Sequence, residues 1–184
     1  MTVETPSLTT PRLLLRPLEL LDADAAQCLF PHWKIVRFLA SSVPWPYPSD
    51  GVLRHIRDRL LPAVQQGSEW HWSIRLRTSP DQLIGMIGLM DQPNDNRGFW
   101  LDPAWQKQGL MSEASAAVTE YWFETLKRPV LRAPKAVANS RSRRISERGG
   151  MRVIAKEERN YVSGRLPAET WEITRDEWLA QRRG

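Results

Sequence analysis

The sequence predicts one mixed α/β domain in which a mostly antiparallel sheet is flanked by helices. A chain of 184 residues fits a single core, because domains commonly hold ~100–200 residues. Segments that alternate apolar and polar side chains occur in neighbouring pairs near both ends, and one long amphipathic helix pattern lies between them. No repeat or linker-like composition divides the chain, so we expect a single domain over residues 1–184.

The first 48 residues predict a strand, helical turns and a stiff loop. Arg12–Leu18 has the pattern of a strand, and a helix should begin at Asp22, where acidic residues occupy the favourable first turn. Residues 32–39 should continue as helix or form a second short helix. Three prolines at alternate positions in 43–48 exclude a regular helix, so this aromatic segment should be a loop.

The next segment predicts a helix and then a hairpin. Ser49 can cap a helix whose apolar residues recur at helical spacing as far as Val64, and Pro62 should bend or fray its last turn. The strands Trp70–Arg77 and Gln82–Met90 should pair across a short turn.

The second half of the chain predicts the crossover helix and the closing strands. After a short strand at Arg97–Leu101, a long helix should run from Gly109 to about Leu126, because apolar residues recur along one face. A strand at Val130–Ala133 and a short helix at Asn139–Arg148 should follow. The closing strands are predicted at 151–155, 159–162 and 169–174.

Composition narrows the compartment and the partners. A lone cysteine, Cys28, cannot form an internal disulfide, and no Cys/His spacing suits a metal, so we expect no metal cofactor. Residues 1–10 lack the order of a signal peptide, and no run approaches the ~18 apolar residues of a membrane helix. We therefore expect a cytoplasmic protein with no membrane partner. Nucleic acid is not the expected partner, because an anionic cofactor explains the net charge of +5 equally well.

The most informative stretch is the turn between the strand at 97–101 and the long helix. The free backbone N–H groups at the start of a helix bind anions, phosphate above all. Lys107 adds positive charge beside them. A plain glycine turn before an amphipathic helix is the alternative. The N–H groups in question belong to Gln108, Gly109, Leu110, Met111 and Ser112.

The chain resembles the GNAT acyltransferase superfamily in four segments, in the family's order. Gln106-x-x-Gly109-x-Met111 resembles its Q/R-x-x-G-x-G/A pyrophosphate loop, and Gly98–Leu101 resembles the strand that holds the pantetheine arm. Asn139-x-x-Ser142, followed by residues 147–151, resembles its N-x-x-S…E-K-x-G-F segment. The opening residues 10–16 are similar to the first strand of the branch of ribosomal-protein N-terminal (Rim-type) acetyltransferases.

The resemblance implies an acyl-CoA N-acyltransferase-like fold whose sheet splays beside the cofactor. It implies direct transfer of the acetyl group of acetyl-CoA to a primary amine, either a protein N-terminus or a small molecule. One or two of Arg141, Arg143 and Arg144 can meet the 3′-phosphate because Arg suits phosphate, and Arg144 is the residue we expect there, although basic helix faces are often simply solvated. The expected cofactor-binding residues are Trp100, Leu101, Gln106, Lys107, Gln108, Gly109, Leu110, Met111, Ser112, Asn139 and Arg144.

The resemblance assigns catalysis to Ser142 and Asn139. Many members protonate the departing thiolate with a tyrosine, but here that position is Ser146, and a serine at the place of Ser142 serves in the Rim-type branch. The backbone near Trp100 and Leu101 should stabilise the oxyanion. Asn139 should hydrogen-bond the pantetheine amides or the reacting region.

Two further departures concern the base and the turn. Asn96 stands where the branch often has a Glu base, which leaves Asp91, Asp95 and Glu69 as nearby candidates, each more typical of a solvated loop carboxylate. Met111 stands where a small residue is usual, so its side chain could narrow the pyrophosphate turn or shift its contacts.

The acceptor pocket should be aromatic, and two questions stay open. Trp45, Tyr47 and Trp72 are the expected acceptor-binding residues, although aromatic residues beside proline also serve to pin a loop to the core. The alternative function is a non-catalytic acetyl-CoA- or nucleic-acid-binding module on the same fold. A homodimer is conceivable because exposed strand edges often pair.

Overall fold

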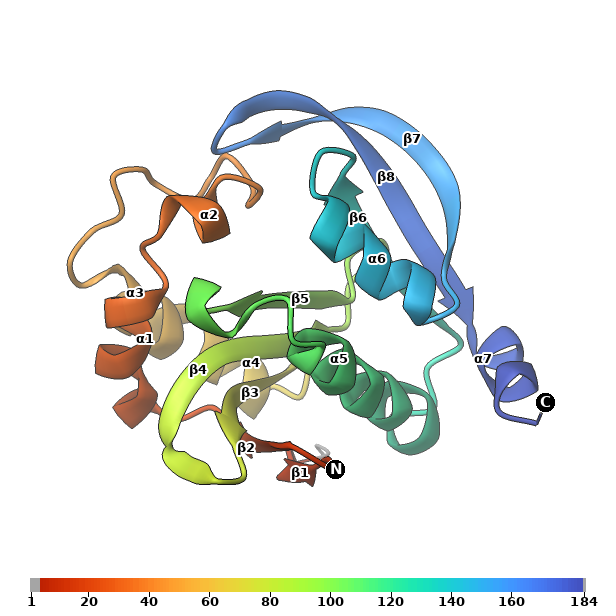
Figure 1. The fold of residues 1–184 in the computed structure, drawn as a ribbon, viewed down its shortest axis with the longest axis horizontal. Coiled ribbons are helices and arrows are strands. Elements are labelled where there is room, and N and C mark those ends of the chain that lie inside the picture. The colour runs from red at the N-terminus through yellow and green to blue at the C-terminus, as the bar shows by residue number, and fades with distance from the viewer. Residues whose placement is uncertain (1–3, 184) are drawn as a thin grey trace.

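A computed structural model describes residues 4–183, in which eight strands form two separate antiparallel sheets (Figure 1). Residues 1–3 and 184, which the single-domain prediction includes, lie outside this part of the chain. The five-stranded sheet has the order β1 (Leu8–Thr9), β2 (Leu13–Pro17), β3 (Glu69–Leu76), β4 (Ser79–Met90), β5 (Arg97–Leu101). The three-stranded sheet has the order β6 (Val130–Ala136), β8 (Gly164–Thr174), β7 (Arg152–Tyr161).

Helical segments cover both faces of the larger sheet. The crossover helix α5 (Leu110–Glu120), continued by the π-helical turn η4 (Tyr121–Thr125), packs on one face, while α1 (Ala23–Leu29) and α4 (Leu61–Gln65) contact the other. The remaining segments are η1 (Leu20–Asp22), α2 (Trp33–Val36), α3 (Gly51–His55), η2 (Ile56–Leu60), η3 (Pro103–Trp105), α6 (Ser140–Arg148) and α7 (Arg175–Gln181). No helix in residues 4–183 has the length and apolarity needed to cross a membrane.

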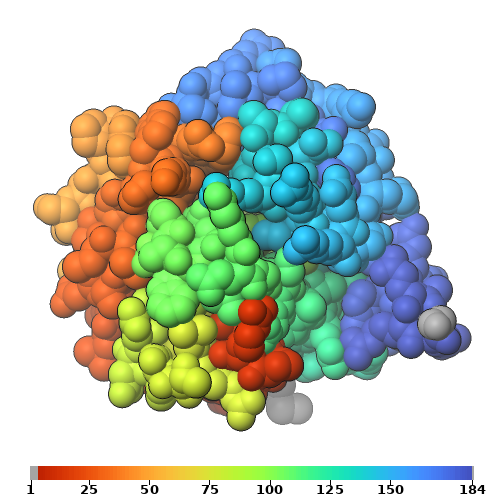
Figure 2. All heavy atoms as spheres, in the orientation of Figure 1, coloured from red at the N-terminus to blue at the C-terminus, as the bar shows by residue number. Residues whose placement is uncertain are grey.

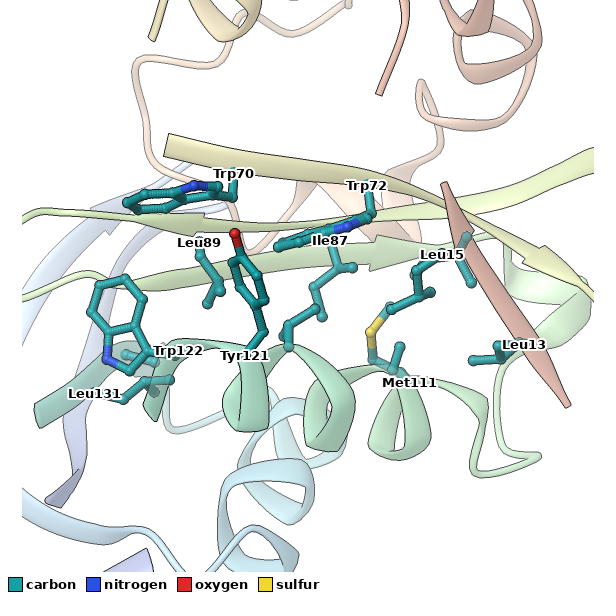
Figure 3. Packing of buried hydrophobic residues seen from close by; sticks show 14 of the residues in the cluster. Leu13, Leu15, Trp70, Trp72, Ile87, Leu89, Met111, Tyr121, Trp122 and Leu131 are labelled. Carbon is teal, nitrogen blue, oxygen red and sulfur yellow. The ribbon is translucent and has the colours of Figure 1, made fainter. Parts of the chain in front are cut away.

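Aromatic side chains fill the space between the five-stranded sheet and the crossover helix. Trp72 meets Tyr121 edge-on with ring centroids 5.5 Å apart, and Trp70 meets Trp122 in the same way at 6.4 Å (Figure 3). Such pairs add about 0.5–1.5 kcal/mol each beyond the burial of their area. This packing fixes α5, and therefore its N-terminus, against the sheet.

The two sheets meet at Asn96 and diverge from there. The backbone N–H of Asn96 donates to the Arg132 carbonyl at 2.7 Å, and its side-chain oxygen accepts from the Arg132 N–H at 2.8 Å. The side-chain amide of Asn96 also donates to the carbonyls of Met90, at 3.1 Å, and Gln92, at 2.5 Å. The side chain is buried, so Asn96 joins β5 to β6 at one end of the splay.

The predicted fold class is confirmed, and several element boundaries are corrected. The closing strands predicted at 151–155 and 159–162 are one strand, β7, because the polar residues between them lie on an exposed edge that pairs only with β8. The hairpin turn is shorter than predicted, since β4 already begins at Ser79. The short strand β1 and the helix α7 had no prediction.

The helix from Gly51 to Gln65 continues through Pro62. Proline has no N–H to donate to the carbonyl four residues earlier. The preceding turn, Ile56–Leu60, adopts the wider π form. The predicted bend is therefore a local change of helical pitch rather than the end of the helix.

Candidate active site

The turn before α5 places free backbone donors at the helix N-terminus. Lys107 and Gly109 both adopt left-handed backbone angles, with φ of 66° and 78°, so the chain reverses direction sharply. Gly109 is the N-cap, and no side chain caps the first turn. The first N–H groups of α5 therefore keep their hydrogen-bonding capacity for an anion.

The turn is held in place by its own Gln106 and by side chains from two other segments. Gln106 donates to the Leu101 carbonyl at 2.8 Å, and Arg141 of α6 hydrogen-bonds the Gln106 side-chain oxygen. On the other side, Arg12 donates to the Gln108 carbonyl at 2.9 Å. In Figure 2 the green segment that contains β5 and this turn lies beside the cyan α6. The loop is thus clamped between the N-terminal strands and α6.

The side chains of the first helical residues divide between core and surface. Leu110 and Met111 are buried, and Met111 points toward Leu15 in the apolar cluster (Figure 3). The expectation that Met111 could narrow the turn is therefore wrong, because its side chain leaves the turn for the core. Any contact of these two residues with an anion must come from their backbone N–H groups. Ser112 stays half-buried and Lys107 exposed.

The edge of β5 that faces the splay carries unpaired backbone groups. Asp102 donates to the Ile84 carbonyl and Asn96 accepts from the Met90 N–H, so the even-numbered residues between them hydrogen-bond to β4. The N–H groups of Phe99 and Leu101 consequently point away from β4, into the splay. Trp100 and Leu101 were the residues expected to stabilise the oxyanion. The N–H of Trp100 is directed at β4, so of these two residues only Leu101 offers its N–H to the splay.

The helix α6 presents two serines to the interior. Asn139 is its N-cap, and the Asn139 side-chain oxygen accepts from the Ser142 N–H at 3.3 Å. Ser142 is buried with its hydroxyl facing β6, whereas Ser146 is completely buried one turn further along. Within residues 4–183 the Ser146 hydroxyl has no hydrogen-bond partner. Arg144 points to the surface.

A buried lysine lies against Ser142. Lys135 of β6 donates to the Ser142 hydroxyl oxygen at 2.8 Å, and its Nζ is 4.9 Å from the centroid of the Phe99 ring. Burial above all, and then the positive charge of Arg97, lower the pKa of Lys135, and the charge of Asp95 opposes both; the net pKa is about 7. Burial likewise raises the pKa of Asp95 to about 6, against the charges of Lys135 and Arg159.

A family model described as an acetyltransferase (GNAT) domain matches residues 12–152. The chain belongs to the GNAT acetyltransferase family. That match contains the turn, the open edge of β5 and the two α6 residues Asn139 and Ser142. Among curated protein sequences, none matches this chain.

Solved structures share the GNAT fold over nearly the whole chain. The ribosomal L7/L12 α-N-protein acetyltransferase RimL, in complex with coenzyme A, is similar at 16% identity with a TM-score of 0.78, over 92% of this chain and 98% of that one. The ribosomal-protein-S5-alanine acetyltransferase from Vibrio fischeri is similar at 13% identity with a TM-score of 0.78, over 94% and 98%. An acetyltransferase from Agrobacterium tumefaciens is similar at 24% identity with a TM-score of 0.70, over 94% and 96%.

The residues of this GNAT acetyltransferase fit acetyl-CoA. The uncapped first turn of α5 offers donors to a pyrophosphate, and the open edge of β5 offers alternating N–H and C=O groups to the amides of a pantetheine arm. Among the described residues, no group of three or more His, Cys, Asp or Glu side chains could hold a metal ion.

The expected acceptor-binding aromatic residues of the GNAT chain do not lie together. Trp72 is completely buried and its indole N–H donates to the Pro6 carbonyl at 2.7 Å, so its assignment to the acceptor pocket is wrong. Tyr47 meets Phe30 edge-on at 5.0 Å, and Phe30 meets Trp100 at 5.4 Å. Trp45, 44% exposed, stacks at a tilt on Trp33 outside this cluster.

The three candidate carboxylates of the GNAT site have different surroundings. Asp91 pairs with Arg128 at 2.7 Å on the surface. Glu69 is buried, so the expectation that it is a solvated loop carboxylate is wrong. Its carboxylate contacts His71 at 2.6 Å and Arg59 at 3.0 Å. Burial alone would raise the pKa of Glu69, but these two partners outweigh it and hold the pKa below its ordinary value. Asp95 lies close to the splay. Unlike the pKa of Glu69, its pKa is raised above the ordinary value.

Sequence reasoning missed Lys135, Phe99 and Arg12. Leu131, Ala133 and Lys135 follow the period of two that places them on one face of β6, and all three are buried. The strand prediction ended at Ala133, two residues before the lysine. Extending it would have placed a lysine inside the protein.

Proposed function

We propose that this chain transfers the acetyl group of acetyl-CoA directly to a primary amine. The observation that supports the proposal most is the pairing of an uncapped α5 N-terminus with an open β5 edge, inside a match to the GNAT domain. Residues 106–112 would bind the pyrophosphate mainly through backbone N–H groups. Arg144 would meet the 3′-phosphate from the exposed face of α6.

The open edge of β5 would stabilise the oxyanion. Attack of an amine on a thioester places negative charge on the carbonyl oxygen, which needs a fixed donor. The N–H groups of Phe99 and Leu101 point into the splay and are held there by the pairing of β5 with β4. Because they are already oriented, they need no reorganisation during the reaction.

Ser142 would protonate the departing thiolate, and Asp95 would accept a proton from the acceptor. An alkyl ammonium has a pKa near ~10 and must lose a proton before it can attack. The raised pKa of Asp95, about 6, brings this carboxyl closer to the acceptor's than an ordinary aspartate. Asn139 would hold Ser142 in place through its cap to the Ser142 N–H.

The acceptor would be a protein N-terminus or a small-molecule amine. The two named ribosomal-protein acetyltransferases of the same fold favour an α-amine slightly. Tyr47 and Trp100, joined through Phe30, would form an aromatic wall on the acceptor side of β5. A cytoplasmic location and a homodimer stay predictions.

Calorimetric titration followed by a turnover assay tests the proposal. Acetyl-CoA and free CoA should bind saturably, ATP should bind far more weakly, and a panel of amines and peptide N-termini should contain an acetylated acceptor. Absence of acetyl-CoA binding by the folded protein would refute the cofactor site. Binding without turnover on any amine would favour a non-catalytic acetyl-CoA-binding module instead.

A further inference from the structure

Lys135 occupies an unusual position for a charged residue. Its side chain is only 6% exposed, and within residues 4–183 it makes no ion pair with a carboxylate. Its neighbours are the Ser142 hydroxyl, the Phe99 ring and the Arg97 guanidinium, whose charge repels it. A buried ammonium without a close counter-ion is costly, so its presence calls for an explanation.

The hydrogen bond between Lys135 and Ser142 fixes the direction of the serine's own hydrogen. A lysine ammonium can only donate, so the Ser142 oxygen must accept from it. No acceptor for the Ser142 O–H exists among the described residues. The hydroxyl hydrogen is therefore free to donate to a further atom, which is what protonation of a thiolate requires.

We propose that Lys135 is a positioning residue that acts through Ser142, by orienting its O–H and by replacing the proton that Ser142 gives to the departing thiolate. The inference rests on the proposed function of acetyl transfer. It assigns the buried lysine a role that Ser142 alone cannot fill, since a serine that has given up its proton must regain one before the next turnover.

The proton balance of the step closes without another reactant. As the C–S bond breaks, the Ser142 O–H proton moves to sulfur and an ammonium proton of Lys135 moves to the serine oxygen. The acceptor ammonium loses two protons on its way to the amide. Asp95 takes the first before the attack and releases it to solvent. The second leaves the nitrogen after the attack, and Asp95, whose charge acts on Lys135, is the neighbouring carboxylate that can carry it to the amine of Lys135.

Several charged groups surround this pair and set its pH dependence. Arg97 lies on β5 and Asp95 precedes it, while Glu169 lies opposite on β8 and is paired with Arg143 at 2.9 Å. Because Lys135 must be protonated to donate, kcat should fall as the pH rises through the pKa of Lys135, about 7.

Kinetics of Lys135→Met give the first test. The kcat of the variant should be roughly 100-fold lower, which is the size of effect expected for a group that transfers a proton. Its KM for acetyl-CoA should stay within about threefold of the wild-type value. The decrease of kcat above pH 7 should disappear. Lys156→Met, on the exposed edge of β7, is the matched control and should leave kcat and KM unchanged. Unchanged kcat in a folded Lys135→Met protein would overturn the proposal.

Lys135→Arg separates charge from proton supply. A guanidinium keeps the charge and the donor but does not give up a proton in this pH range. The low kcat should therefore persist in this variant. Recovery of wild-type kcat in Lys135→Arg would overturn the proposed proton supply, and the role of Lys135 would then be only to hold Ser142 in place.

An NMR titration of ¹³C-lysine-labelled protein tests the inference without turnover. One of the resonances of Lys34, Lys107, Lys127, Lys135 and Lys156 should titrate near pH 7 and vanish in Lys135→Met. Arg97→Met, which removes the repelling cation, should move this titration and the fall in kcat to higher pH together. A Lys135 that titrates at its ordinary pKa would refute the inference even in an active enzyme. A titration near 7 in a protein that acetylates no amine would instead place the failure in the proposed function.

Discussion

At the scale of single residues, Gly109 decides whether the α5 N-terminus can receive an anion. Its left-handed backbone, with φ of 78°, suits glycine, and a Cβ there would meet Arg12 at 3.4 Å. Gly109→Glu would add backbone strain of about 1–2 kcal/mol and place a carboxylate where a pyrophosphate should lie. We expect acetyl-CoA binding to be lost in a calorimetric titration.

Gly164→Glu is the matched control for this substitution. Gly164 also has a positive φ, 115°, but is the first residue of β8, directly after the turn from β7, with open space around it. It should lose stability in the same way and keep its affinity for acetyl-CoA. Equal affinity in both variants would show that the glycine turn does not bind the cofactor.

Asn96 has a structural role that its position in the sequence concealed. Asn96→Ala would leave the Arg132 N–H and the Met90 and Gln92 carbonyls without their buried partner, which should cost about 2–3 kcal/mol. Urea unfolding would measure this loss. Asn94→Ala, whose side chain is exposed, should change the free energy of unfolding by less than about 0.5 kcal/mol.

The residue types of the site could be predicted from the sequence, but their surroundings could not. The turn at 106–112 and the pair Asn139 and Ser142 were found because each motif lies within a few residues of sequence. The burial of Glu69 depends on its contacts with Arg59 and His71 and on the strands beside it, which no local pattern contains. The burial of Lys135 follows the period of two along β6, but its contact with Ser142 of α6 does not.

At the scale of elements, Glu113 ties the start of α5 to the first strands. It accepts from the Thr10 hydroxyl at 2.5 Å, from the Arg12 N–H at 2.8 Å and from the Arg12 guanidinium at 2.7 Å. Burial alone would raise the pKa of Glu113, but hydrogen bonds from Thr10 and Arg12 lower it overall. These contacts hold the N-terminal strands against the helix that bears the anion site.

Glu113→Gln should therefore destabilise the protein in a pH-dependent manner. A depressed pKa in the folded state contributes stability that is present above the unfolded value, near ~4.3, and is lost as the pH falls through the folded value. We expect a loss of about 1–2 kcal/mol in urea unfolding at pH 7 and a smaller difference at pH 3.5. The exposed Glu147→Gln should show no such trend, and an equal loss at both pH values would contradict the charge-based explanation.

Element types were predictable where the periodicity was strong and the element long. The crossover helix has a continuous apolar face, and the strands β3 and β5 are short runs bounded by turn residues. The continuity of β7 was not predictable, because Lys156, Glu157 and Glu158 are charged residues that extend a strand only through pairing with a neighbour. The helix α7 begins with a capping box at Thr174 and Glu177, a local signal that could have been recognised.

At the scale of the whole molecule, acetyl-CoA would connect two sheets that otherwise join at Asn96. Ligand at 100 times its Kd stabilises the folded state by about 2.7 kcal/mol. For a chain of this length that corresponds to a rise in Tm of roughly 5–11 °C. Thermal unfolding with and without acetyl-CoA measures the shift, and Gly109→Glu should show none. A wild-type Tm that saturating ligand leaves unchanged would contradict a site between the sheets.

The open edge of β5 also has a consequence for hydrogen–deuterium exchange. The Arg132 amide is bonded to Asn96 and should exchange slowly with or without ligand. The amides of Phe99 and Leu101 have no partner on β4, so in the free protein they should exchange faster than their neighbours Gly98 and Trp100. This alternation of fast and slow amides along one short strand should disappear when a pantetheine arm completes the edge. Amide exchange in the free enzyme would then alternate with a period of two along β5, and the fast-exchanging amides would be those that the cofactor binds.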